Sequence, residues 1–294
     1  MEDPAAPRPD VTVVVPTYAR PDAIRACVAA LQAQAGASLE IVVVDDGSPV
    51  PVADLPGGPH PLTMIRQANA GPAAARNAGV RAARAGLVAL TDDDCRPHPG
   101  WAAAFLRASR FQPGALLGGA TRNAAPGPFA RTSQEMVDHL ADLSADRPRF
   151  FPSNNIALPR NAYLAVGGFP EDYPLAAGED RAFCRAWEAS GRPFAAVPDA
   201  VIDHHHALTL GGFWRQHRNY GEGARTFHDT ADAGPRRPGY AIALGLVAAP
   251  LRLRRSGVGP MRNVAIGAGT AVLVAVAQMA TARGYARAAR RGRT

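Results

Sequence analysis

Residues 11–48 read VTVVVPTYARPDAIRACVAALQAQAGASLEIVVVDDGS, and this stretch decides the fold. The apolar runs 11–15 and 41–44 each predict a buried strand, because neither run alternates apolar with polar residues. Between the two runs, helical spacing is shown by Ile24, Cys27, Val28 and Leu31. A strand, a helix and a strand in this order predict a parallel sheet that helices cover on both faces.

A third apolar run covers residues 86–90. After one further residue, Thr91, come three consecutive aspartates, Asp92, Asp93 and Asp94. Three carboxylates at one strand exit repel one another unless a cation neutralises them. Mg²⁺ and Mn²⁺ prefer oxygen ligands and often bind together with substrate phosphates. The stretch therefore predicts a site for Mg²⁺ or Mn²⁺, and the alternative is an acidic surface loop.

Polar residues also follow the first two predicted strands. Pro16 and Thr17 end the first strand, and Asp45 and Asp46 end the second. Ligands of open α/β sheets bind at the carboxyl ends of the strands. Together with the three aspartates, these residues predict one binding crevice along one edge of the sheet.

Residues 69–77, NAGPAAARN, predict a turn that leads into a helix. Arg76 lies early in that helix, where backbone N–H groups and a guanidinium can meet a phosphate. The alternative is an exposed helical arginine.

Six segments in a fixed order resemble the family 2 glycosyltransferases, over about residues 10–225. They are VVVPTYARP at 13–21, VVVDDGS at 42–48, NAGPAAARNAG at 69–79, ALTDDDCRPHPGW at 89–101, SNNIALPRNAYLAVGGF at 153–169 and GEDRAFCRAWEASG at 178–191. The resemblance implies an α/β protein of the GT-A fold, a Rossmann-like, mostly parallel sheet with helices on both faces. It also implies inverting transfer of a sugar from a nucleotide-sugar, a UDP-sugar above all, to a hydroxyl acceptor such as a lipid-linked glycan.

The resemblance assigns roles to particular residues. The donor-binding positions are Pro16, Thr17, Asp45, Asp46, Arg76, Asp93 and Asn155. The metal-binding positions are Asp92 and Asp94, which form the family's DXD motif (Asp, any residue, Asp), and His204. Which two of the three aspartates bind the ion stays open. Asn154 is a further candidate for a sugar or acceptor contact. His204 opens a run of three histidines, and His206 is the second choice; the alternative is a histidine at the edge of the core.

Glu179 and Asp180 stand at a predicted helix start, where acidic residues also simply complement the helix dipole. The resemblance matches Asp180 to the catalytic base and Glu179 to its neighbour. An alcohol that attacks a sugar must lose its proton, and a carboxylate can accept it. Attack from the face opposite the leaving diphosphate would invert the anomeric centre. Downstream, residues 213–221 predict an aromatic and basic helix that ends near Gly221.

Charge divides the chain of 294 residues, whose formal net charge is +7. Every basic residue is Arg: residues 1–234 hold 21 Arg against 25 acids, and residues 235–294 hold 11 Arg and no acid. A tail that is both basic and apolar favours an anionic membrane surface over nucleic acid as a partner. We expect a disordered lead-in at 1–9, a catalytic domain at 10–230 and a helical tail at 231–294.

The tail contains two apolar stretches, residues 240–251 and 264–282. The first is too short to span a bilayer, and the second is uncharged and long enough to do so. The alternative is a long helix packed on the catalytic domain or on a second subunit. We expect the protein at the cytoplasmic face of the cell membrane, bound peripherally or through one span. The three cysteines, Cys27, Cys95 and Cys184, are too widely separated for a disulfide framework or a zinc site.

Two other functions remain open at this point. A nucleotidyltransferase usually carries a glycine-rich, basic phosphate loop after its first strand, and residues 16–20 lack one. A non-catalytic, membrane-bound scaffold would not need the carboxylates of Asp92, Asp94 and Asp180.

Overall fold

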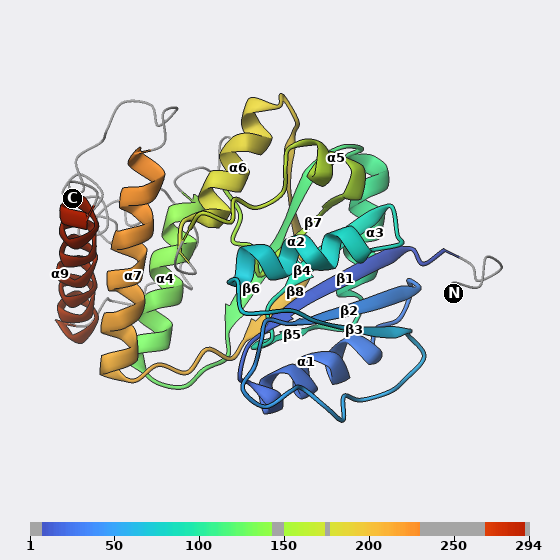
Figure 1. Cartoon of the computed structure of the whole chain (residues 1–294), viewed down its shortest axis with the longest axis horizontal. Helices are drawn as coiled ribbons and strands as arrows, with labels where there is room; N and C mark the ends of the chain where they lie inside the picture. The colour runs from blue at the N-terminus through green and yellow to red at the C-terminus, as the bar shows by residue number, and fades with distance from the viewer. Residues whose placement is uncertain (1–7, 143–149, 174–176, 230–267, 292–294) are drawn as a thin grey trace, which may run out of the picture. The chain divides into compact units, whose positions relative to one another are not determined.

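The computed structural model describes residues 8–142, 150–173, 177–229 and 268–291 (Figure 1). The chain divides into two compact units: unit 1 comprises residues 1–124, 144–174 and 179–205, and unit 2 comprises residues 125–143, 175–178 and 206–294. The predicted domain boundary at residue 230 and the apolar stretch 240–251 lie outside the described residues, as does most of the predicted lead-in.

The described part of unit 1 contains a mixed sheet in the order β3-β2-β1-β4-β7-β6-β8-β5. Its strands are β1 (Val11–Thr17), β2 (Leu39–Asp45), β3 (Leu62–Arg66), β4 (Leu87–Thr91), β5 (Cys95–Pro97), β6 (Leu116–Asn123), β7 (Asn155–Pro159) and β8 (Phe194–His204). The pairs β1–β2, β2–β3, β1–β4 and β6–β8 are parallel. The pairs β4–β7, β6–β7 and β5–β8 are antiparallel. The predicted parallel arrangement is therefore confirmed for the first strands, and β7 and β5 make the sheet mixed.

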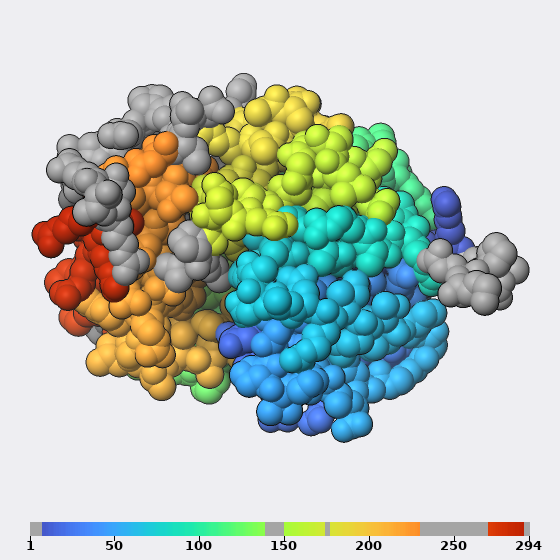
Figure 2. Space-filling model, in the orientation of Figure 1, coloured from blue at the N-terminus to red at the C-terminus, as the bar shows by residue number. Residues whose placement is uncertain are grey.

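Helices cover both faces of this sheet, as the unbroken apolar runs of β1 and β2 predicted. On one face lie α1 (Pro21–Gln32) and α3 (Trp101–Phe111), and on the other lie α2 (Pro72–Ala82), α5 (Arg160–Ala165) and α6 (Glu179–Ala189). Because side chains alternate along a strand, Val13 of β1 packs with the α1 cluster and Val14 with the α2 cluster. Figure 2 shows α2 and α5 as the outer layer of unit 1 on the second face.

Gly79 lets α2 approach the sheet closely. A Cβ atom at this position would lie 2.3 Å from Cγ1 of Val14. Because β1, β2 and β4 are parallel, their carboxyl ends share one edge of the sheet, and the start of α2 lies at that edge, where the Gly71 N–H donates to Asp46.

Unit 2 contains α4 (Pro128–Asp142), α7 (Leu210–Asp229) and α9 (Ala268–Arg291), which lie side by side in Figure 1. A Cβ atom on Gly221 of α7 would lie 1.9 Å from the backbone oxygen of Thr281 in α9, so the two helix backbones touch. The prediction that the helix ends near Gly221 is wrong. Gly221 serves close packing inside a helix that continues to Asp229.

The predicted helical C-terminal extension is present as α9. It continues to Arg291, past the uncharged stretch that ends at residue 282, and includes Arg283, Arg287 and Arg290. Among the helices of the described residues, none combines the length and the apolar character that crossing a lipid bilayer requires.

Candidate active site

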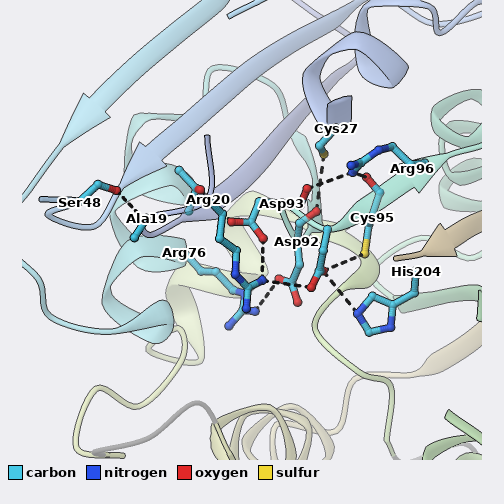
Figure 3. A network of polar contacts seen from close by, with 12 residues as sticks. Ala19, Arg20, Cys27, Ser48, Arg76, Asp92, Asp93, Cys95, Arg96 and His204 are labelled. Atoms are coloured by element: carbon cyan, nitrogen blue, oxygen red, sulfur yellow. Dashed lines mark hydrogen bonds and ion pairs between the residues drawn. The ribbon is translucent and has the colours of Figure 1, made fainter. Parts of the chain in front are cut away.

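The aspartates after β4 form a hydrogen-bonded network with the last residue of β1 and with residues that follow it (Figure 3). The Thr17 hydroxyl donates to Oδ2 of Asp93 at 2.7 Å. The Arg20 guanidinium donates to Oδ1 of Asp93 at 3.0 Å and to Oδ2 of Asp94 at 3.1 Å. Burial, reinforced by the charges of Asp94 and Asp92, raises the pKa of Asp93 to about 6 despite Arg20 and Thr17. The predicted meeting of these strand exits is therefore present in unit 1.

Arg20 is a residue that the sequence analysis passed over. Its guanidinium joins two of the three aspartates, and half of the side chain is exposed to solvent. The turn that carries it contains Ala19 in the left-handed region, at φ 54°, with its N–H donating to the Ser48 hydroxyl. A basic residue three positions after the end of a predicted strand was the available signal, because it had to lie at the same sheet edge as the aspartates.

Asp45 and Asp46 hold the neighbouring loops in place. Asp45 accepts hydrogen bonds from the Ser48 N–H at 2.9 Å and from Arg66 at 2.6 Å. Burial opposes ionisation of Asp45, but the hydrogen bonds from Ser48 and Val52 and the charge of Arg66 lower its pKa.

Asp46 fixes the loop before α2. Its carboxylate accepts from the side chain of Gln67 and from the backbone N–H groups of Ala70 and Gly71, at 2.8, 3.0 and 2.8 Å. Because a carboxylate has about four acceptor positions, one remains for a ligand.

Arg76 is buried, with 4% of its surface exposed, so the alternative of an exposed helical arginine is wrong. Its Nη2 donates to Oδ1 of Asp92 at 2.7 Å, and its Nη1 lies 3.5 Å from Oε1 of Glu179. The guanidinium also lies over the Phe169 ring, 5.5 Å from the centroid. One cation thus joins the aspartate cluster to the acidic pair at the start of α6.

Glu179 and Asp180 occupy the first turn of α6, as predicted. Burial raises the pKa of both carboxyls, the charge of Asp180 raises that of Glu179 further, and the charge of Asp92 adds to both shifts. Oδ1 of Asp180 accepts from the Arg181 N–H at 2.8 Å. Oε2 of Glu179 is buried and has no hydrogen-bond partner among the described residues. A carboxyl with a raised pKa that still accepts few hydrogen bonds is suited to accept a proton.

His204 ends β8 and lies near Cys95, as Figure 3 shows. Its Nε2 lies 3.4 Å from Oδ1 of Asp94, and the Cys95 thiol lies 4.0 Å from the same oxygen. Burial opposes protonation of His204, but Asp94 raises its pKa. Asp94 and His204 offer an oxygen and a nitrogen that suit a divalent ion, whereas Asp92 is ion-paired with Arg76 and is not among the described ligand atoms that lie within 4.8 Å of one another.

Asn155 does not reach a ligand through its amide hydrogens. Its Nδ2 donates to the backbone oxygens of Ala120 and Ala200 at 3.0 and 3.1 Å, and its Oδ1 accepts from Trp101 at 2.8 Å. The residue is 2% exposed, so its place is in the packing between strands. Its neighbour Asn154 fits a ligand better, because the buried Oδ1 of Asn154 has no partner among the described residues.

The fold and this cluster define an α/β protein with a polar site at the carboxyl ends of its strands. The chain belongs to glycosyl transferase family 2, whose family model matches residues 12–169. It is therefore a glycosyltransferase with the GT-A fold, which confirms the family, the fold and the enzyme class that the six segments implied.

Curated relatives and solved structures agree with this assignment. The pre-mycofactocin glycosyltransferase of Mycobacterium tuberculosis is 28% identical over 238 residues, which cover 75% of this chain and 49% of the relative. The chain thus spans about half the length of that relative. The succinoglycan biosynthesis protein ExoO of Rhizobium meliloti is 41% identical over 95 residues, 31% of this chain and 27% of that protein.

Two solved structures share the fold. The mannosyltransferase PcManGT from Pyrobaculum calidifontis, in complex with GDP-Man and Mn²⁺, superposes with a TM-score of 0.62 at 22% identity and covers 98% of this chain and 87% of that one. TarS 1–349 of S. aureus, in complex with UDP, superposes with a TM-score of 0.52 at 16% identity and covers 96% of this chain and 91% of that one. At these identities the likeness shows the fold alone.

Proposed function

We propose that this glycosyltransferase transfers a sugar from a nucleotide-sugar to a hydroxyl acceptor, with inversion at the anomeric carbon and with a divalent cation. The neighbour structures support a nucleotide-sugar donor, because one contains GDP-Man with Mn²⁺ and the other contains UDP. UDP- and GDP-sugars are therefore both candidates.

The observation that carries the proposal is the bridge that buried Arg76 makes between Asp92 and Glu179. Donor chemistry needs positive charge where a diphosphate leaves, and acceptor chemistry needs a carboxylate that takes a proton. In unit 1, the Arg76 side chain therefore contacts both the aspartate cluster of the donor side and the acidic pair that would accept the proton.

The donor half of the site consists of the strand exits. Thr17, Asp45 and Asp46 lie where a nucleoside would rest, and Arg20 and Arg76 offer guanidinium groups to a diphosphate. Asp92 and Asp94, with His204, would hold Mg²⁺ or Mn²⁺. When bound, such an ion neutralises charge that develops on the leaving diphosphate.

The acceptor half consists of Glu179 and Asp180. Asp180 accepts the proton of the acceptor hydroxyl as that oxygen attacks the anomeric carbon. Glu179 keeps Arg76 in place and contributes the negative charge that favours proton uptake by the pair. Attack from the side opposite the diphosphate produces inversion.

Product analysis tests the proposal against its rivals. The protein is incubated with Mn²⁺ and a panel of UDP- and GDP-sugars, and the released phosphates are separated by ion-exchange chromatography. Release of a nucleoside diphosphate, abolished in Asp180→Asn, supports sugar transfer or its hydrolytic side reaction. A nucleotidyltransferase would release pyrophosphate only from a nucleoside triphosphate and a sugar 1-phosphate, so a parallel incubation with these two substrates tests that alternative. No turnover in either incubation would favour a scaffold.

We also propose that α9 helps bind an anionic membrane surface at the cytoplasmic face. Its described residues include exposed apolar side chains, Val272 and Met279, followed by exposed Arg283, Arg287 and Arg290. An arginine near an anionic surface contributes about 1 kcal/mol. Because α9 packs on α7, side-chain substitutions test this proposal better than truncation does.

Sedimentation with vesicles that contain phosphatidylserine measures this binding. Changing all three arginines to Gln should weaken binding strongly at low salt. The matched control changes three exposed arginines of unit 1, Arg81, Arg107 and Arg110, to Gln and removes the same charge. Equal loss of binding in both triple variants would show a general charge effect and contradict a role for α9.

A further inference from the structure

We infer that Asp94, Cys95 and His204 form a zinc site that differs in chemistry from the Mg²⁺ or Mn²⁺ site proposed above. One ligand atom of each residue lies within 4.8 Å of the other two. The Cys95 thiol is 4.0 Å from Oδ1 of Asp94, and Nε2 of His204 is 3.4 Å from the same oxygen.

The sheet topology brings these residues together although they lie far apart in the sequence. β5 and β8 pair antiparallel, and Cys95 stands directly opposite His204 in their register. Directly opposed residues on an antiparallel pair project from the same face, with Cβ atoms about 4.5–5.5 Å apart. The spacing of the cysteines alone indicated no zinc site, because the histidine that completes one comes from a strand more than a hundred residues downstream.

The observed separations are close to those of a tetrahedral zinc site. Zinc binds sulfur and nitrogen at about 2.0–2.3 Å, so ligand atoms around it lie roughly 3.3–3.8 Å apart. The Asp94–His204 separation already falls in this range, and the Asp94–Cys95 separation exceeds it by a few tenths of an ångström. The third separation, between the ligand atoms of Cys95 and His204, is within 4.8 Å, so closing the site requires side-chain movements of up to about 1 Å. Three protein ligands leave a fourth position for water.

The two oxygens of Asp94 have separate neighbours. Oδ1 faces His204 and Cys95, whereas Oδ2 accepts a hydrogen bond from Arg20. An ion at the Oδ1 side does not require Arg20 to leave.

The ligand types select the metal. A thiolate and an imidazole favour Zn²⁺ over Mn²⁺ and Mg²⁺, both by softness and by the general order of affinities of divalent ions. The thiol releases its proton to solvent when the ion binds. Zinc should therefore bind more tightly than Mn²⁺ at this position, at micromolar or lower concentrations.

One consequence rests on the proposed function. Because Asp94 and His204 belong to both donor sets, Zn²⁺ held by these two residues and Cys95 would compete with the Mn²⁺ that assists nucleotide binding. Zn²⁺ should then inhibit transfer, and the inhibition should be relieved in Cys95→Ser.

Cobalt spectroscopy on the full chain tests the site without any donor or acceptor. Metal-free protein is titrated with Co²⁺, and thiolate ligation produces a near-ultraviolet charge-transfer band. We expect the band in the wild type, its displacement by Zn²⁺, its loss in Cys95→Ser, and at least about tenfold weaker Zn²⁺ binding in His204→Gln. Cys184→Ser is the matched control, because Cys184 is a buried thiol of unit 1 that hydrogen-bonds to the Phe151 oxygen and should keep the band.

Two results would overturn the inference. Absence of the band in the wild type would exclude thiolate ligation, and a band that survives Cys95→Ser but is lost in Cys27→Ser would move the site to another thiol. If Cys95→Ser does not fold, X-ray absorption at the zinc edge of the wild type decides: one sulfur neighbour supports the site, and none contradicts it. Because no nucleotide takes part, failure here leaves the proposed sugar transfer untouched.

Discussion

Arg76 donates a 2.7 Å hydrogen bond to Asp92 from a buried position at the edge of the sheet. A buried arginine needs carboxylate partners, and removing one partner leaves an uncompensated charge. The same guanidinium lies 3.5 Å from Glu179, so the acid at the end of β4 and the acid at the start of α6 depend on one cation.

Arg76→Gln should destabilise the protein. The substitution leaves Asp92 and Glu179 without their cation, and we expect a loss of about 3–5 kcal/mol in the free energy of unfolding at neutral pH. Urea unfolding followed by circular dichroism measures this loss. The control is Arg25→Gln, because Arg25 is half-exposed and 3.6 Å from exposed Asp22, and it should change stability by less than about 1 kcal/mol. Equal effects of the two variants would contradict the central role of Arg76.

Nucleoside diphosphate should bind more tightly with Mn²⁺ than with a chelator, and Asp94→Ala should remove the difference. The reason is that Asp94 supplies a carboxylate to the proposed ion. Isothermal titration calorimetry with UDP and with GDP measures both affinities. Asp22→Ala, which removes a fully exposed carboxylate, should keep the metal effect. Affinity that is independent of metal in the wild type would show that the ligand assignment is wrong.

The apparent pKa of the acid limb of the pH–rate profile should be higher than the ordinary pKa of an aspartate, which is about 3.9. Burial raises the pKa of Glu179 and of Asp180, and the base must be ionised to accept a proton. Activity should therefore rise with pH through that raised value. Plots of kcat/KM against pH report it for the free enzyme. Glu179→Gln should keep an acid limb; a flat profile in this variant would move the base to Glu179.

His217 should make unit 2 sensitive to acid. Burial lowers the pKa of His217 to about 4, below the unfolded value of about 6.5. The folded state thus holds its proton less tightly than the unfolded state. The contribution of neutral His217 to the free energy of unfolding is therefore fully present above about pH 6.5 and is lost as the pH falls through about 4. The full effect corresponds to roughly 3 kcal/mol.

His217→Phe is the matched variant for this pH effect. It keeps an aromatic ring next to Phe213 and Tyr220, whose centroids lie 4.4 and 5.4 Å from the His217 ring, and it cannot titrate. Thermal unfolding between pH 7 and pH 4.5 should show a smaller decrease in Tm for the variant than for the wild type. Parallel decreases would mean that other groups cause the acid sensitivity.

Sequence patterns predicted the fold because the first strands are unbroken apolar runs and α1 carries a clear helical stripe. Sequence patterns did not predict the role of a residue where contacts between distant parts of the chain determine that role. Gly221 was taken as a helix end, yet close contact with the α9 backbone requires a residue without a side chain at that position. Asn155 was taken as a ligand contact, yet Trp101 and two backbone oxygens use its amide.

The candidate site was predicted in part. The strand exits at Thr17 and at the aspartates do meet, because carboxyl ends of parallel strands share an edge. The burial of Arg76 and the role of Arg20 depend on side-chain packing, which spacing does not reveal. The proximity of Cys95 to His204 depends on the register of β5 and β8, two strands far apart in the sequence. The catalytic roles of Asp180 and Glu179 stay predictions.

The most direct measurement compares Asp180→Asn with the wild type in donor binding and in turnover. Asn keeps the shape of the side chain and loses the charge that accepts a proton. If Asp180 is the base, we expect nearly unchanged affinity for the nucleoside diphosphate by calorimetry and a turnover lowered by about 10²- to 10⁴-fold. Near-normal turnover in Asp180→Asn, with donor binding intact, would contradict the account.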